Sequence, residues 1–273
     1  MENKYEFEYE NKEYPFLNVP KCIGSEEYEV TNYSIQIIKE KYPLYKGNNK
    51  YKFREWRKHR RQMSTAGAFL EHDDKFSIDI VADIITSNKF IATGINEQQN
   101  IDFKINNRIY HSIGNILPVC EGINHRWGGY DCCWVKFNVL KEYIEKKDGY
   151  DENSLKGVEE KIRNGNYLGH GITNQGCLRY WIYKNLPEVI WEEFVKQNYL
   201  QDFVNDKFDP IDLTTLLYKS SPEHKRRVRR IAPEEIDKLN RMIIKRGYRI
   251  WNEGRSLDDS GVDQIINSIK ETL

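Results

Sequence analysis

Apolar residues recur at the three- and four-residue spacing of a helix most clearly near the C-terminus. Ile236, Leu239 and Ile243 share one face of a segment that follows Pro233. Proline suits the first turn of a helix, because the N–H group that it lacks would have no intrahelical partner there. Glycine suits the position just after a helix end. The sequence therefore predicts a helix that begins at Pro233 and ends at Gly247.

A second helical stripe lies at the end of the chain. Apolar residues stand at Val262, Ile265 and Ile269, with polar residues between them. Ser260 suits the N-cap of this helix, and Asp263, three residues later, resembles the acidic partner of a capping box. Because an apolar helix face needs a surface to cover, we expect this last helix to dock on the core.

Helical faces also recur in the rest of the chain. We expect helices after Asn32, along residues 50–62, along residues 137–144 and from Pro187, with Ile190 on the buried face of the last one. The segment 50–62 is dense in lysine and arginine. Together these faces predict a mainly α protein.

Extended structure is predicted in only a few places. Apolar and polar residues alternate along residues 101–105, which predicts a half-buried strand, whereas residues 76–92 fit a strand or a helix equally well. Residues 1–20 form an extended lead-in. Residues 146–176, rich in Gly, Asn, Asp and Lys, form a surface excursion with at most one short helix. We therefore expect a single compact helical domain with a small β element, spanning residues 1–273.

The composition is that of a folded protein with a strongly charged surface. Hydrophobic residues make up 39% of the chain and charged residues 31%, and the mean hydropathy is -0.77. Lysine plus arginine (42) balance aspartate plus glutamate (42), so the net charge draws the protein neither to nucleic acid nor to a membrane. Any polyanion must be held by a local patch. No apolar run approaches the roughly 20 residues that cross a bilayer, and the N-terminus lacks the pattern of a signal peptide.

The cysteines indicate the compartment. An odd number of them, five, without an export signal indicates free thiols, so we expect a cytoplasmic protein. Cys120, His125, Cys132 and Cys133 are of the types that bind zinc, but the two adjacent cysteines would point apart in regular structure. Buried free cysteines are the better interpretation. Phosphate-loop and dinucleotide motifs are also absent from the sequence, so we expect neither a metal nor another cofactor.

The first basic cluster lies in the segment 50–62. Arg54 and His59 stand as Arg-Glu-Trp-Arg-Lys-His, a spacing that resembles the signature of the HEPN ribonucleases, although Glu55 replaces the polar residue usual there. The resemblance implies RNA cleavage without a metal, with histidine moving a proton and arginine stabilising the charge on the phosphorane. The alternative is a solvated basic helix face. Further candidates for anion binding here are Lys58, Arg60 and Arg61.

A second basic cluster follows near residue 225. If it lies on the same side as the first, a neutral molecule could hold a phosphate backbone. The alternative is an exposed linker whose cations pair with Glu234 and Glu235. The cluster consists of Lys225, Arg226, Arg227, Arg229 and Arg230.

A third group of polar residues surrounds glycines in the middle of the chain. His111 is a candidate acid or base, Arg126 a clamp for a carboxylate or phosphate, and Asn115 and Asn124 polar groups of a pocket. The alternative is a structural turn, in which Gly114 shapes the chain and the polar side chains bond to buried backbone groups.

This middle part also resembles an uncharacterised family of proteins from Gram-positive bacteria and their mobile elements. The matching segments are residues 111–118, with the pattern Ile-Gly-Asn-Ile-Leu-Pro, residues 137–143, and residues 198–204, with Leu-Gln-Asp-Phe-Val. The resemblance covers about residues 108–210 and implies a shared fold more than a chemistry. The long segment 146–176 departs from the family.

Two functions are therefore expected from the sequence. The first is a nucleic-acid-directed protein, an RNA-cleaving effector in phage–host conflict, with Arg54, His59 and His111 as catalytic residues. The second is a non-catalytic binding or sensor protein that recognises a protein or a small ligand through residues 111–129. Neither function requires a membrane.

Overall fold

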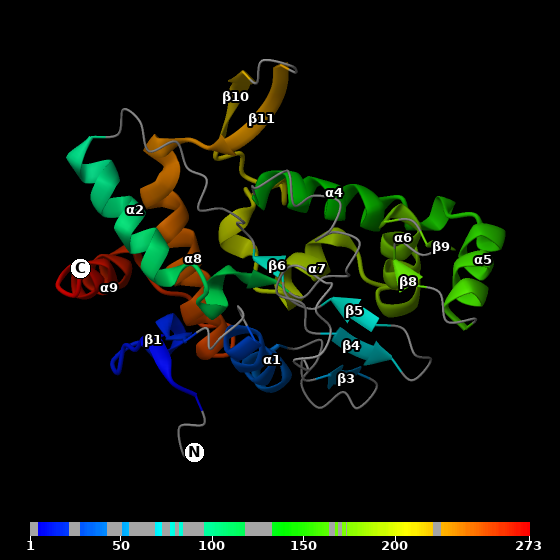
Figure 1. The fold of residues 1–273 in the computed structure, drawn as a ribbon, viewed down its shortest axis with the longest axis horizontal. Helices are drawn as coiled ribbons and strands as arrows, with labels where there is room; N and C mark the ends of the chain where they lie inside the picture. Colours follow the sequence, from blue (N-terminus) through cyan, green and yellow to red (C-terminus); the bar gives the residue numbers. More distant parts are fainter. Residues whose placement is uncertain are drawn as a thin grey trace.

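The computed structural model describes most of the chain and is mainly helical (Figure 1). The described residues include eight α-helices. None of these helices combines the length and the apolar character that crossing a bilayer requires. The described residues are 5–21, 28–42, 51–54, 69–72, 77–79, 82–83, 96–117, 133–163, 167–168, 171–172, 174–220 and 225–273.

The helices supply most of the buried surface. The α-helices are α1 (Tyr28–Lys41), α2 (Glu97–Ile109), α4 (Cys133–Glu145), α5 (Glu152–Arg163), α6 (Asn174–Asn185), α7 (Trp191–Gln197), α8 (Ile236–Trp251) and α9 (Asp259–Lys270). The 3-10 turns are η1 (Pro15–Leu17), η2 (Ile113–Asn115), η3 (Lys147–Gly149), η4 (Gln201–Phe203) and η5 (Pro233–Glu235).

The strands form small separate sheets, of which all but one are antiparallel. The longest pair is β10 (Thr214–Ser220) with β11 (Lys225–Ile231). A three-stranded sheet contains β3 (Tyr51–Arg54), β4 (Phe69–His72) and β5 (Ser77–Asp79). The remaining pairs are β1 (Phe7–Tyr9) with β2 (Val19–Pro20), β6 (Ala82–Asp83) with β7 (Ile116–Leu117), and the parallel β8 (Tyr167–Leu168) with β9 (Gly171–Ile172).

Helix α8 lies at the centre of the packing. It contacts α2, α9, η1, η2 and η4, which come from both ends and the middle of the chain. Leu239, Ile243 and Ile250 are fully buried on it, as their helical spacing predicts. The predicted start of this helix, at Pro233, is confirmed by η5, which leads directly into α8. Its predicted end at Gly247 is wrong, since the helix continues to Trp251.

Two glycines explain how η2 packs against α8. A Cβ atom at Gly114 would lie 2.1 Å from the carbonyl oxygen of Ile243, so only glycine allows this approach. A Cβ atom at Gly247 would lie 2.9 Å from Cδ2 of Phe16. Gly247 therefore serves close packing inside the helix and does not end it, which is why its interpretation as a terminator fails.

Helix α9 docks on α8 as predicted. Its apolar residues Val262, Ile265 and Ile269 are all buried. The predicted capping box at Ser260 is wrong by two residues, because Asp258 is the N-cap and its Oδ1 accepts a hydrogen bond from the Gly261 N–H group (2.8 Å).

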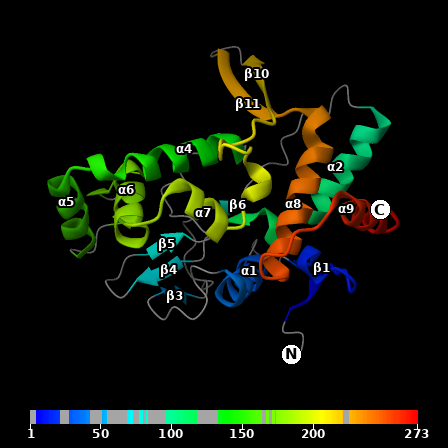
Figure 2. The ribbon, with the colours of Figure 1, turned by 180° about the vertical axis from the view of Figure 1, so that it is seen from behind.

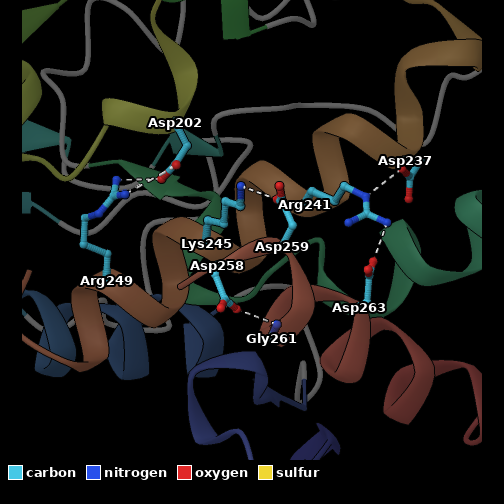
Figure 3. Close-up of polar contacts among 9 residues, drawn as sticks. All are labelled: Asp202, Asp237, Arg241, Lys245, Arg249, Asp258, Asp259, Gly261 and Asp263. Atoms are coloured by element: carbon cyan, nitrogen blue, oxygen red, sulfur yellow. Dashed lines mark hydrogen bonds and ion pairs between the residues drawn. The ribbon is translucent and has the colours of Figure 1, made fainter. Parts of the chain in front are cut away.

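Ion pairs surround the apolar contact between α8 and α9 (Figure 3). Nζ of Lys245 lies 2.7 Å from Oδ1 of Asp259, and Nη2 of Arg241 lies 2.7 Å from Oδ1 of Asp263. The bond from Lys245 lowers the pKa of the Asp259 carboxyl below its usual value. Asp263 thus serves as a partner for Arg241, which explains why it is absent from the helix cap.

The strand predicted at residues 101–105 is wrong, because this segment is part of α2. A capping box fixes the start of the helix: Oδ1 of Asn96 accepts from the Gln99 N–H group and Oε1 of Gln99 accepts from the Asn96 N–H group. Two polar residues occupy the buried face and obscure the helical pattern. One is Asp102, and the other is Asn106, whose Nδ2 donates to Oδ1 of Asn240 (2.8 Å).

The helix predicted along residues 50–62 is also wrong at its start, where β3 pairs with β4. Tyr51 and Phe53 alternate with Lys52 and Arg54, which is the period of a strand. Residues 55–62 lie outside the described part of the chain.

Three further expectations are corrected. The segment 146–176 contains more structure than one short helix, since α5 alone has 12 residues and buries Leu155. Pro187 begins no helix, because α7 starts at Trp191. Ile190, expected on a buried face, is the N-cap residue of α7 and is 56% exposed.

Candidate nucleic-acid interface

The second basic cluster of the sequence forms a β-strand. Four of the predicted anion-binding residues, Arg226, Arg227, Arg229 and Arg230, lie on β11 together with Lys225. Seven residue pairs join β11 to β10 in antiparallel register, from Thr214 opposite Ile231 to Ser220 opposite Lys225. The cluster is therefore half of a regular hairpin.

The hairpin extends away from the helices (Figures 1 and 2). Both views show it projecting beyond α4, α2 and α8. Its base is anchored in the core, where Leu213, Ile231 and Ala232 are buried and the Ala232 N–H group donates to the Leu213 carbonyl (2.9 Å). Among the described elements, none packs extensively along either strand except its partner strand. The hairpin is thus a two-stranded arm with an anchored base.

The two strands of the arm contain six cations and no acidic residue. Strand β11 reads Lys-Arg-Arg-Val-Arg-Arg-Ile, and β10 reads Thr-Thr-Leu-Leu-Tyr-Lys-Ser, without an acidic residue. The register places Lys219 directly opposite Arg226. Like charges at directly opposed positions of a strand pair in general destabilise the pair.

Of the acidic residues near the cluster in the sequence, Glu223 lies outside the described residues, and Glu234 and Glu235 lie beyond the base of the arm. Glu234 and Glu235 belong to η5, after the end of β11. Oε2 of Glu235 lies 4.0 Å from Nζ of Lys238, on α8. The carboxylate of Glu235 thus has a cation of the helical body as its neighbour.

The structure does not bring the two basic clusters together. Arg54 is the last residue of β3, and both views show β3 near the bottom of the molecule and the β10–β11 hairpin at the top (Figures 1 and 2). Lys58, His59, Arg60 and Arg61 lie outside the described residues. The described part of the first basic cluster therefore shares no surface with β11.

The third predicted group is largely structural where it is described. Asn115 is fully buried, and its Nδ2 donates to the Tyr110 carbonyl (2.7 Å), which closes the turn from α2 into η2. His111 is half-buried in the same turn, with its ring 4.5 Å from the ring of Tyr110. Asn124 and Arg126 lie outside the described residues. This geometry matches the structural turn rather than an open pocket at Asn115.

A buried arginine, Arg246, explains why this turn is ordered. Its guanidinium donates to the carbonyl oxygens of Gly114 (2.8 Å), Ile116 (2.8 Å) and Asn198 (3.2 Å), and to the hydroxyl of Tyr42 (2.6 Å). Arg246 is 0% exposed. It therefore joins the residue that follows α1, the turn η2 with β7, and the segment after α7 around α8.

Burial changes the proton affinity of both polar partners in this cluster. It raises the pKa of the Tyr42 hydroxyl, and the charge of Arg246 opposes that rise. Burial also lowers the pKa of the Arg246 guanidinium, and Tyr42 opposes that fall. Arginine stays charged at any physiological pH, so the carbonyl dipoles and the hydroxyl hold a cation inside the core.

Sequence reasoning missed Arg246. The sequence predicts only a helix end here, at Gly247. The available signal was its position: Arg246 follows Leu239 and Ile243 and precedes Ile250 at helical spacing, on the apolar face of α8.

Among the described residues, no group of three His, Cys, Asp or Glu side chains is arranged to hold a metal ion. Of the cysteines and histidine weighed for zinc, Cys120, His125 and Cys132 lie outside those residues.

Comparison with models of known families, with curated proteins and with solved structures gives no match. The resemblances to the Gram-positive family and to the HEPN ribonucleases therefore stay predictions.

Proposed function

We propose that this protein binds nucleic acid and that the β10–β11 hairpin contacts the phosphate backbone. The observation that carries the proposal is the placement of the cations, in a strand whose hairpin extends beyond the helical body (Figure 1). Lysine and arginine that neutralise phosphates release condensed counterions, which supplies most of the affinity of such contacts. A local arm of this kind suits a protein with zero net charge.

Edge protection is the competing explanation for a charged strand. Charged residues on an edge strand prevent it from pairing with another chain. The pair Lys219 and Arg226 argues against this explanation alone, since opposed cations weaken the hairpin and one charge would suffice to protect an edge. Bound phosphates would offset the repulsion of such a pair.

Neutralising the arm tests the proposal. The variant Arg226→Gln, Arg227→Gln, Arg229→Gln removes three positive charges from β11. We expect it to weaken binding to a fluorescein-labelled 24-base-pair duplex at least about tenfold in fluorescence anisotropy, because three phosphate contacts are lost. The thermal midpoint should change little, since the arm packs on itself.

A matched control removes the same charge elsewhere. Lys104→Gln, Lys156→Gln, Lys238→Gln neutralises exposed lysines on α2, α5 and α8. This control should bind within about twofold of the unchanged protein, because dispersed surface charges are screened beyond about 10 Å. Equal losses in both variants, or unchanged binding in the hairpin variant, would contradict a role for the arm. Aggregation without lost binding would support edge protection instead.

A further inference from the structure

We infer that the preferred ligand is a B-form DNA duplex, with the hairpin standing in its major groove between the two phosphate backbones. The inference rests on the proposed function and adds the class of nucleic acid and the groove. It depends on three features of the arm: the distribution of cations over its two faces, its dimensions, and its aromatic content.

The register places cations on both faces of the ribbon. Residues alternate between the faces along a strand, and directly opposed residues share a face. One face therefore receives Lys225, Arg227 and Arg229, opposite Ser220, Tyr218 and Leu216. The other receives Arg226 and Arg230 of β11 together with Lys219 of β10. A ribbon with three cations on each face matches anions on two sides, whereas a sheet covered on one face by the protein body presents cations on one side only.

The dimensions of the ribbon fit the major groove of B-DNA. A β-sheet with its side chains occupies a layer about 10 Å thick, and the major groove is about 12 Å wide, which admits a two-stranded ribbon. The seven residue pairs of the hairpin extend over about 20 Å at roughly 3.4 Å per residue. The arm is thus long enough to follow the groove over several base pairs. The major groove of an RNA duplex is too deep and narrow for side chains to read.

The ribbon lacks the stacking platform that binds single strands. Sites for single-stranded nucleic acid combine a basic groove with aromatic side chains on which successive bases stack. Across both strands of the hairpin, Tyr218 is the one aromatic residue. One ring cannot support a row of bases, so the arm favours a ligand held by its backbones.

The test compares four probes and two variants with the full chain. The probes are a 24-base-pair DNA duplex, the same sequence as single-stranded DNA, as single-stranded RNA and as duplex RNA, each measured by anisotropy over the same series of salt concentrations. One variant replaces Lys225, Arg227 and Arg229 by Gln, and the other replaces Lys219, Arg226 and Arg230 by Gln. Each variant removes the cations of one face.

We expect the DNA duplex to bind at least about tenfold more tightly than the other three probes. Both variants should weaken duplex binding, and each should reduce the slope of log affinity against log salt by about 2.7, since a phosphate contact contributes about 0.9 to that slope. Methyl green, which occupies the major groove, should displace the protein, and netropsin, which occupies the minor groove, should not.

Three results would overturn the inference while leaving the proposed function intact: tighter binding of a single strand or duplex RNA, an effect of only one face variant, or displacement by netropsin alone. Salt-independent binding, or no binding of any probe, would instead end the proposed function and the inference with it.

Discussion

The core around Arg246 and the β10–β11 hairpin use the same residue type in opposite ways. Arg246 is fully buried, and its hydrogen bonds end on carbonyl oxygens and a hydroxyl of this chain. The arginines of β11 lie in an arm that projects from the body (Figure 1). Where the chain itself supplies acceptors, an arginine organises the fold. Where the strands of a projecting ribbon contain cations and no acidic residue, we propose that the acceptors come from bound nucleic acid.

Replacing Arg246 should cause the largest loss in the molecule. In Arg246→Met, the carbonyl groups of Gly114, Ile116 and Asn198 lose a buried donor, so we expect the free energy of unfolding to fall by about 3–5 kcal/mol. Urea denaturation followed by circular dichroism measures this. The exposed Arg255 provides the matched control, and Arg255→Met should stay within about 0.5 kcal/mol of the unchanged protein.

A comparable stability of Arg246→Met and Arg255→Met would mean that the buried arginine does not hold the core together. The proposed contrast between Arg246, which organises the fold, and the arginines of the hairpin would then be contradicted.

Gly114→Ala should give the next largest effect. The new Cβ atom would meet the backbone of α8 at 2.1 Å, and backbone cannot move aside as a side chain can, so we expect a loss of about 3 kcal/mol. Gly149, in η3, has no atom within 4 Å of its added Cβ, and Gly149→Ala should be close to neutral. Equal urea midpoints for the two variants would contradict the close packing of η2 on α8.

RNA cleavage by Arg54 and His59 stays a prediction, and it can be tested independently of DNA binding by the hairpin. If this pair is catalytic, His59→Ala should slow cleavage of a labelled 20-nucleotide RNA at least about 100-fold, because general acid–base catalysis is lost. The same variant should bind DNA unchanged, since His59 is not among the residues proposed to contact the phosphate backbone. Cleavage that does not respond to His59→Ala would remove the catalytic assignment.

The smallest expected effect concerns the ion pair of Lys245 and Asp259. Its hydrogen bond lowers the folded-state pKa of Asp259 below the ordinary value of 3.8, so the pair adds stability above that pH and loses it as the pH falls through the folded pKa. Asp259→Asn should therefore lower the thermal midpoint slightly at pH 7 and make no difference near pH 2. A difference that persists at pH 2 would point to lost packing rather than lost charge.

Sequence patterns predicted the elements whose burial follows a simple period. Helices α8 and α9 bury apolar residues at helical spacing, and the sequence predicts one helix from Pro233 and one capped by Ser260. Helix α2 was missed because the polar residues Asp102 and Asn106 occupy its buried face, where the Asn106 amide donates to Oδ1 of Asn240 on α8 and the Asp102 backbone carbonyl accepts from Nδ2 of Asn240. A polar residue with a distant partner therefore interrupts the apolar pattern without interrupting the helix.

The candidate interface was only half predictable. The cluster at 225–230 could be recognised as basic, but its arrangement as a strand depends on pairing with β10. Side chains of a strand alternate between its two faces, whereas those of an irregular linker do not. Only the pairing with β10 shows which of the two structures the basic cluster adopts. The role of Arg246 depends on acceptors at Gly114 and Asn198, more than a hundred and nearly fifty residues away along the chain, which no local pattern reveals.

The salt dependence of DNA binding tests the central claim most directly. For the unchanged protein and a variant with all six hairpin cations replaced by Gln (Lys219, Lys225, Arg226, Arg227, Arg229 and Arg230), the affinity for the 24-base-pair duplex is measured between low and physiological salt. If the arm holds the phosphates, log affinity falls with log salt at a slope near −5 for the unchanged protein, and the variant loses most of that slope. Equal slopes for the two proteins would contradict binding through the hairpin.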